Sequence, residues 1–208
     1  MQAMPRPIVL KGDLTQEALD DLGSKNEVSV DCEMMGLNPM RDRLCLVQIS
    51  AEKGGCYLVQ VEERTGAPRM KAVMENAAII KIFHFARMDM QFLQARLNIS
   101  VKNVYCTKIA SRFARTYTDK HGLKELVREI AGENMDKTSQ SSDWGRDTLT
   151  AEQLRYAAQD VKFLFKIKRT LESMLERENR QELAHAFMGF LPTLIQADVQ
   201  GYQDIFAH

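Results

Sequence analysis

Short apolar segments with strand character crowd the first third of this 208-residue chain, and helical periods fill most of the rest. Turn residues separate the strand-like segments, most clearly at the Gly54-Gly55 pair. Their close spacing favours an antiparallel arrangement, and the later helices would cover the faces of the sheet. We therefore predict an α/β fold: a mixed sheet, antiparallel in its first strands, flanked by helices and followed by a helical C-terminal part. The expected strands are 7–10, 27–32, 44–50, 56–61 and 79–85, and the expected helices are about 88–97, 107–115, 122–131, 150–177 and 179–190.

Composition narrows the class of protein. Apolar residues make up 45% of the chain, enough for a hydrophobic core, so we expect one domain spanning residues 1–208. The four cysteines show no metal-ligand or disulfide spacing, as is typical of a reduced intracellular protein. Without a targeting segment or a run of about 18 apolar residues, we expect a cytoplasmic protein with no membrane contact. Basic and acidic residues number 28 each, which excludes a strong positive field for holding long nucleic acid.

Acidic residues stand at three informative places. The stretch VSVDCEMMGL ends a predicted strand with Asp31 and Glu33, which share one face because strand side chains alternate. Asp89 lies just inside the helix that follows the apolar segment IIKIF, where the partly positive helix N-terminus tolerates an anion. In a late helix, Tyr156 and Asp160 are four residues apart and so lie on one helical face.

Taken singly, these motifs have ordinary explanations. A D-x-E pair arises by chance in many chains, Asp89 suits a helix N-terminus, and Tyr156 and Asp160 suit a charged helix surface. Their ordered combination instead indicates four clustered carboxylates, which repel one another unless a cation neutralises them. Oxygen ligands favour Mg²⁺ or Mn²⁺ over zinc. Two such ions about 4 Å apart are a standard device for cleaving phosphodiesters, and Tyr156 would then hold or help deprotonate the attacking water.

At these residues the sequence resembles the DEDDy class of 3′-to-5′ exonucleases, in the ribonuclease D branch of the ribonuclease H-like fold. The resemblance rests on DCE, HFARMD and YAAQD, and it extends through SSDWGRDTLTAEQLRYAAQDVKFL. It implies that Asp31, Glu33, Asp89 and Asp160 bind two metal ions and that Tyr156 orients water, so that all five are catalytic. In EMMGL, Leu37 falls where related oligoribonucleases place an apolar side chain between terminal bases.

Length separates the branches of this family. The residues after about 180 are too few for the helical HRDC domain of ribonuclease D. Segments such as RDRLCLVQIS, CTKIASR, RTYTDKHGLKE and DIFAH are most similar to short stand-alone oligoribonucleases of the nano-RNase C type. That resemblance implies diribonucleotide substrates, such as linear products of cyclic dinucleotide turnover, and a ring-shaped homo-oligomer such as an octamer. Trimming the 3′ ends of longer RNA or DNA is the alternative activity, and a non-catalytic RNA-binding module is the alternative class.

Several residues are candidates for substrate binding. His84 could bond the terminal phosphate or ribose, or it could be satisfied within the strand end. Gln140 and Trp144 could line a nucleotide pocket, or Trp144 could lie in the core beside a capping turn at Ser142 or Asp143. In related enzymes Asn often stands in place of Phe85, and Thr or Ser in place of Met35. The full set of candidates is Met34, Gly36, Leu37, His84, Phe85, Gln140 and Trp144.

Two further segments allow two interpretations each. The basic residues between 102 and 124 could hold a 5′ phosphate, or they could form a solvated helix face. Pro192 is expected to end the last long helix, and the partly apolar tail at 193–208 could contact another copy or complete the core of its own subunit.

Overall fold

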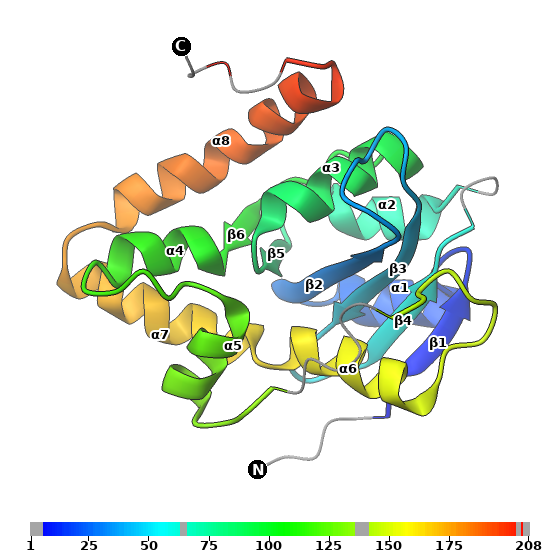
Figure 1. Ribbon diagram of the computed structural model, residues 1–208, viewed down its shortest axis with the longest axis horizontal. Coiled ribbons are helices and arrows are strands. Elements are labelled where there is room, and N and C mark those ends of the chain that lie inside the picture. Colours follow the sequence, from blue (N-terminus) through cyan, green and yellow to red (C-terminus); the bar gives the residue numbers. More distant parts are fainter. Residues whose placement is uncertain (1–5, 63–65, 136–141, 203–204, 206–208) are drawn as a thin grey trace.

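A computed structural model describes residues 6–62, 66–135, 142–202 and 205 of the chain. Within these residues six strands form one mixed sheet in the order β1-β4-β3-β2-β5-β6, with helices on both faces (Figure 1). The predicted α/β class is therefore confirmed. The strands are β1 (Ile8–Lys11), β2 (Glu27–Met34), β3 (Leu44–Ser50), β4 (Cys56–Gln60), β5 (Ile80–Phe83) and β6 (Val104–Cys106).

The middle of the sheet follows the expected antiparallel order, because β2 pairs with β3 and β3 pairs with β4 in antiparallel fashion. The edge strand β1 differs from that expectation, since it pairs in parallel with β4. The cause is helix α1 (Gln16–Gly23), which was not predicted and which carries the chain from the sheet edge towards its centre. The side chain of Thr15 caps this helix by accepting a hydrogen bond from the backbone of Ala18.

Beyond β2 the sheet continues in parallel. β5 pairs with β2, with Ser29 opposite Ile82, and β6 pairs with β5. β6 was not predicted, because a strand of 3 residues is too short for side-chain alternation to stand out. The carboxyl ends of β2 and β5 lie at the same edge of the sheet, which is where ligands usually bind in such folds.

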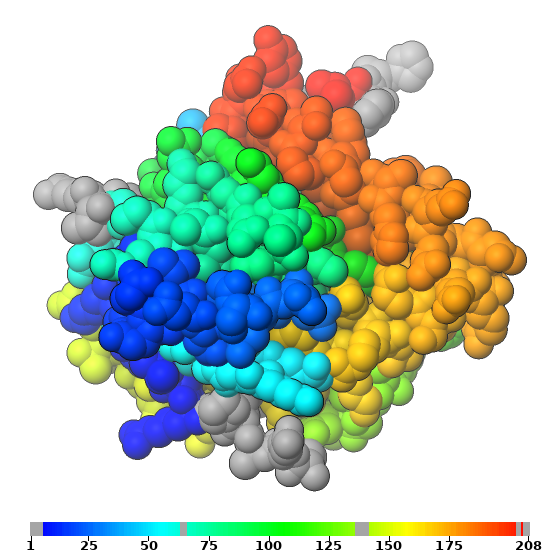
Figure 2. Space-filling model, turned by 180° about the vertical axis from the view of Figure 1, so that it is seen from behind, coloured from blue at the N-terminus to red at the C-terminus, as the bar shows by residue number. Residues whose placement is uncertain are grey.

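Two clusters of apolar side chains hold the layers together. The larger joins the back face of the sheet to α1 and α2, and in the rear view of Figure 2 the blue and blue-green segments that contain these helices cover that face. The smaller packs Ala157 and Val161 of α6 against Leu46 and Leu58 on the front face. The remaining helices are α2 (Pro68–Met74), α3 (Ala86–Leu97), α4 (Thr107–Ala114), α5 (Leu123–Leu126), the π-helix η1 (Val127–Ala131), α6 (Ala151–Lys162), α7 (Leu164–Arg177) and α8 (Gln181–Val199).

The helix expected at 150–177 is two helices, α6 and α7, that meet at Phe163. The apolar faces of the two halves pack on different surfaces. Val161 of α6 belongs to the cluster on the front of the sheet, whereas Ile167 and Leu171 of α7 belong to the larger core. Because one straight helix cannot follow both surfaces, the chain changes direction between them.

Pro192 does not end the last helix, since α8 runs through it from Gln181 to Val199. Proline removes one helical hydrogen bond and crowds the preceding turn, so such a helix needs support from packing. That support comes from Met188 and Leu191 before the proline and from Ile195 after it, all of which are buried in the core. The first part of the predicted tail thus packs on its own subunit.

Two further properties of the described residues concern their helices and their cysteines. None of the helices they form combines the length and the apolar character that crossing a bilayer requires. All four cysteines are buried and carry free thiols.

Candidate active site

Strands β2 and β3 build one wall of the site. Asp31 lies opposite Gln48 in the antiparallel register and Glu33 lies opposite Leu46, so both acids face the same side of the sheet. A register shift follows between Glu33 and Met34, because Met34 pairs with Leu44 and Cys45 of β3 is left as an extra residue. The alternation of side chains along β2 explains how this strand can bury Val28 and Val30 on one face and present two carboxylates on the other.

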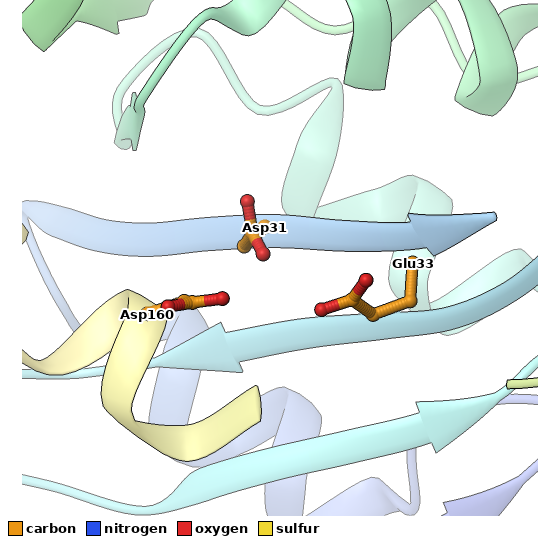
Figure 3. A group of neighbouring side chains, drawn as sticks. All are labelled: Asp31, Glu33 and Asp160. Carbon is orange, nitrogen blue, oxygen red and sulfur yellow. The ribbon is translucent and has the colours of Figure 1, made fainter. Parts of the chain in front are cut away.

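Helix α6 supplies the third carboxylate. Thr150 and Gln153 form a capping box that fixes the start of this helix, and Asp160 lies near its end. One carboxylate oxygen from each of Asp31, Glu33 and Asp160 lies within 4.8 Å of the others. In Figure 3, the Asp160 side chain extends from α6 towards the two strand acids.

Asp89 borders this trio from helix α3. It is 5% exposed, and its carboxylate accepts a hydrogen bond from the backbone of Cys32, which lies between the two strand acids. Its negative charge raises the pKa of both Asp31 and Glu33. The structure therefore brings all four predicted acids into one electrostatic unit, with three of them in the tighter cluster.

The electrostatics of the cluster favour a bound cation. Burial is the main cause that raises the pKa of Glu33 to about 9, followed by the charges of Asp160 and Asp89. Burial also raises the pKa of Asp31 well above its usual range, and the other three acids raise it further. Acids placed in this way cannot all ionise near neutral pH without positive charge among them. Carboxylate oxygens are the donors that Mg²⁺ and Mn²⁺ prefer, so the site fits such an ion.

Tyr156 lies one helical turn before Asp160, as the spacing predicted, and its hydroxyl is hydrogen-bonded to the Asp160 carboxylate. Burial raises the pKa of this phenol, and the negative charge of the acids raises it further. The phenol therefore stays protonated at neutral pH, so it acts as a hydrogen-bond donor rather than as a base. Its ring packs against Trp144, with the ring centroids 6.0 Å apart.

Gln48 is a member of the site that was not predicted. Its side chain is fully buried, and its amide nitrogen lies 3.5 Å from Asp31 Oδ2 and 3.4 Å from Glu33 Oε1. Both contacts are long hydrogen bonds that orient the two carboxylates. The available signal was the position of a lone polar amide within the otherwise apolar LCLVQIS, since a buried strand does not normally carry an unpartnered amide.

The hairpin between β2 and β3 carries three of the predicted substrate residues. Met34 ends β2, Gly36 follows with a φ of +134°, and Leu37 is 79% exposed. A Cβ atom at Gly36 would lie 2.1 Å from Asp42 Oδ2, so only glycine fits there. The Asp42 carboxylate accepts a hydrogen bond from Asn38 N, which closes the loop and presents Leu37 to solvent.

His84 and Phe85 lie between the end of β5 and the start of α3. His84 Nδ1 is hydrogen-bonded to Thr107 Oγ1 at 2.8 Å. Phe85 adopts a left-handed conformation with φ 67° and ψ 46°, which is unusual for a residue with a Cβ atom and often marks a functional site. Its ring is partly exposed, and the Lys108 amine lies 3.9 Å from the ring centroid.

Trp144 is buried in the smaller apolar cluster, with 2% of its surface exposed. This burial agrees with the expected core position, and the predicted role of Trp144 in substrate binding stays a prediction. The helix that follows is capped by Thr150 rather than at Ser142 or Asp143. The Gln153 amide instead donates a hydrogen bond to Ser142 Oγ, which ties the preceding loop to α6. Gln140 lies outside the described residues, so its predicted role stays a prediction.

The predicted basic stretch divides into two groups. Arg115 is 1% exposed, donates hydrogen bonds to Ser111 Oγ and to the backbone of Lys120, and pairs with Glu129. His121 is buried as well, with Nδ1 bonded to the Ser111 hydroxyl. These two side chains hold the loop between α4 and α5 together. The exposed members of the stretch are Lys102, Arg112, Lys120 and Lys124.

The fold and the acidic site together define a class of domain, the 3′-5′ exonucleases. A family model with the description 3′-5′ exonuclease matches residues 7–176. Because that match covers most of the chain, the chain belongs to this family.

Solved structures resemble the whole chain. Brucella melitensis NrnC with bound Mg²⁺ is 41% identical, with a TM-score of 0.91, over 98% of this chain and 100% of that one. Brucella melitensis NrnC bound to pGG is 42% identical, with a TM-score of 0.91, over 99% of this chain and 100% of that one.

Curated ribonuclease D proteins are longer relatives. Ribonuclease D from Acidiphilium cryptum is 29% identical over 182 residues, which cover 86% of this chain but 45% of that protein. The chain thus spans less than half the length of this relative. What the two share is the exonuclease domain.

Proposed function

We propose that this protein is a metal-dependent 3′-to-5′ exoribonuclease that hydrolyses short oligoribonucleotides, above all diribonucleotides, to nucleoside 5′-monophosphates. The observation that carries the proposal is the buried cluster of Asp31, Glu33 and Asp160, flanked by Asp89 and Tyr156. The end-to-end similarity to NrnC with bound Mg²⁺ supports the same conclusion.

The four acids would hold two Mg²⁺ or Mn²⁺ ions, which supply positive charge at the attacking and leaving oxygens of the phosphodiester. Other side chains of the protein would hold the acids and the attacking water in position. Gln48 fixes the orientation of Asp31 and Glu33 through its amide group. Tyr156, protonated and bonded to Asp160, is placed to orient the attacking water.

A short substrate agrees with the surface around the site. Leu37 stands exposed on the β2–β3 hairpin and Phe85 stands partly exposed at the start of α3, so both are available to contact bases. The net charge of zero provides no extended field for a long polyanion. The structure of NrnC bound to pGG supports a short ligand for this chain as well.

The proposal includes self-association and a cytoplasmic location. α8 exposes Leu183, Phe187 and Phe190, with 52%, 54% and 38% of their surfaces accessible. Apolar side chains grouped on one helix commonly mark an interface, and we assign it to a second copy of the chain within a ring-shaped homo-oligomer. Free thiols at all four cysteines agree with a reducing compartment.

The decisive experiment is product analysis on 5′-labelled RNAs from two nucleotides upwards, with Mg²⁺, with Mn²⁺ and with a chelator. We expect complete conversion of the dinucleotide to mononucleotides with metal and none with chelator. Asp31→Ala and Asp160→Ala should abolish hydrolysis while the circular dichroism spectrum stays that of the folded protein. Full activity in either variant, or in chelator, would remove the proposed mechanism.

Trimming the 3′ ends of longer RNA or DNA is the second candidate, and the similarity to ribonuclease D favours it. Measuring kcat/KM on a diribonucleotide, a long single-stranded RNA and a DNA strand separates the two candidates. A higher kcat/KM on either long strand than on the dinucleotide would favour the second.

A further inference from the structure

His84 follows β5 directly, at the edge of the sheet where β2 also ends. β5 pairs in parallel with β2, with Ser29 opposite Ile82. The carboxyl ends of the two strands therefore lie at the same edge of the sheet, and His84 is the first residue after β5 there. α3, which carries Asp89, begins two residues later. His84 therefore lies in the short link between the strand that pairs with β2 and the helix that carries Asp89.

The hydrogen bonds of Thr107 fix where the proton of His84 resides. Thr107 is fully buried, and its hydroxyl donates to the backbone carbonyl of Phe83 at 3.1 Å. A hydroxyl has one proton, so the same oxygen can only accept from His84 Nδ1, 2.8 Å away. Nδ1 of His84 consequently carries the hydrogen. In a neutral imidazole the other nitrogen, Nε2, then presents a lone pair and no proton.

The ring is neutral, because burial lowers the pKa of His84 to about 3 and the nearby Lys108 charge contributes to the same shift. Among the described residues, Nε2 has no hydrogen-bond partner, and the residue keeps some contact with solvent, so the lone pair is available to a ligand. A lone pair repels the oxygens of an ionised phosphate and accepts a hydrogen bond from a hydroxyl group. Of the two ligands considered for His84, phosphate is thus disfavoured and ribose is favoured.

We propose that His84 Nε2 accepts a hydrogen bond from a hydroxyl of the 3′-terminal ribose, with Thr107 and the Phe83 carbonyl fixing the required tautomer. This rests on the proposed function, and it deepens that function by making His84 a specificity residue for the sugar. The 2′- and 3′-hydroxyls offer the same chemistry, and substrates that lack one or the other distinguish them. A protein tells RNA from DNA by contacts of this kind when the 2′-hydroxyl is the donor.

The test combines a variant with modified substrates. We would measure kcat/KM for wild type and His84→Ala on a diribonucleotide, on its analogue with 2′-deoxy sugar at the 3′ nucleotide, and on the 3′-deoxy analogue. Loss of one neutral hydrogen bond changes a rate constant about 3- to 10-fold. We expect the wild-type preference for one of the two hydroxyls to shrink by about that factor in the variant. An unchanged preference for both hydroxyls would overturn the inference, since a purely structural His84 would lower all three rates alike.

A second measurement requires no catalysis. Nitrogen-15 spectra of the wild-type protein, with the His84 signal assigned by its loss in His84→Ala, should show a neutral ring protonated at Nδ1. In the matched variant Thr107→Val, which keeps the shape but removes the acceptor, that tautomer should lose its dominance and the hydroxyl preference should fall. A wild-type ring protonated at Nε2, or charged at neutral pH, would overturn the inference. A wild-type enzyme without RNA hydrolysis would instead overturn the proposed function.

Discussion

At the scale of single residues, a variant of Tyr156 tests whether its hydroxyl acts in the chemical step or in substrate binding. Tyr156→Phe removes the hydroxyl that is bonded to Asp160 and keeps the ring that packs on Trp144. We expect kcat to fall about 100-fold, the lower end of what one positioned proton donor or acceptor contributes, with a much smaller change in KM. Steady-state kinetics on a diribonucleotide measures both constants. Because the pKa of the phenol is raised, the wild-type rate should show no loss from tyrosine ionisation up to pH 10. An unchanged kcat would mean that the hydroxyl has no role in the reaction.

Gln48 offers a test of how the acids are held. Gln48→Leu keeps the approximate volume but removes the amide that contacts Asp31 and Glu33. Groups that hydrogen-bond to metal ligands typically contribute 10- to 100-fold to metal affinity, and these long contacts suggest about 10-fold. A calorimetric titration of the metal-free protein with Mn²⁺ measures the change in metal affinity. Equal Mn²⁺ affinity in wild type and variant, with both folded, would contradict the assigned role.

The residues of the site differ in how well their positions could be predicted from the sequence. Asp31 and Glu33 were predictable because strand alternation alone puts them on one face, and Tyr156 and Asp160 because helical spacing does the same. Gln48 was not predictable, since its meaning depends on the register of β3 against β2, which no local pattern specifies.

At the scale of elements, Pro192 provides a stability test. α8 continues through this residue at the cost of a backbone hydrogen bond and a crowded turn. Pro192→Ala should restore both, and we expect the free energy of unfolding to rise by about 1 kcal/mol or more, equivalent to about 2–4 °C in Tm. Thermal unfolding followed by circular dichroism measures the shift. Thr193→Ala, an exposed position in the same helix, is the control and should change Tm little. A lower Tm in Pro192→Ala would indicate that packing of the proline ring outweighs the restored bond.

Elements were predictable where local periodicity decides them. The strands of the antiparallel centre and the end of α3 agree with their patterns. The break at Phe163 does not, because the apolar stripe continues across it. The direction changes there to satisfy two separate clusters of the core, one on the front face of the sheet and one that joins its back face to helices. The parallel pairing of β1 could not be predicted for a similar reason. It depends on the path of the chain through α1, which no local pattern specifies.

At the scale of the whole molecule, the exposed face of α8 predicts self-association. Leu183→Glu combined with Phe190→Glu places charges on that face while leaving Phe187, whose ring packs on Phe113, unchanged. We expect light scattering after size exclusion to show an oligomer for wild type and a smaller species for the double variant. Glu182→Lys, which alters charge on the same helix without touching the apolar residues, is the control. A wild-type monomer would remove the assignment of this face to a second copy.

The acid cluster also predicts how the stability of the whole chain depends on pH and metal. The pKa of Glu33 is about 9 in the folded protein and near its usual value of 4.5 when unfolded, so the folded state binds more protons between these values. Without metal, the free energy of unfolding should therefore be highest below about pH 4.5 as far as this group is concerned, and it should fall as pH rises towards 9. We expect Mg²⁺ to bind the ionised acids of the folded state alone, so it should offset the loss increasingly as pH rises.

Thermal unfolding from pH 5 to 9, in chelator and in Mg²⁺, measures this effect. We expect Tm in chelator to decline by several degrees across the range and the gain from Mg²⁺ to grow with pH. The double variant Glu33→Gln and Asp160→Asn lacks two of the repelling charges, so it should flatten the decline in chelator and abolish the gain from Mg²⁺. Superimposable Tm profiles with and without Mg²⁺ for the wild-type protein would show that the carboxylates hold no ion. In that case their burial would need a different explanation, such as protons shared among the acids in place of metal.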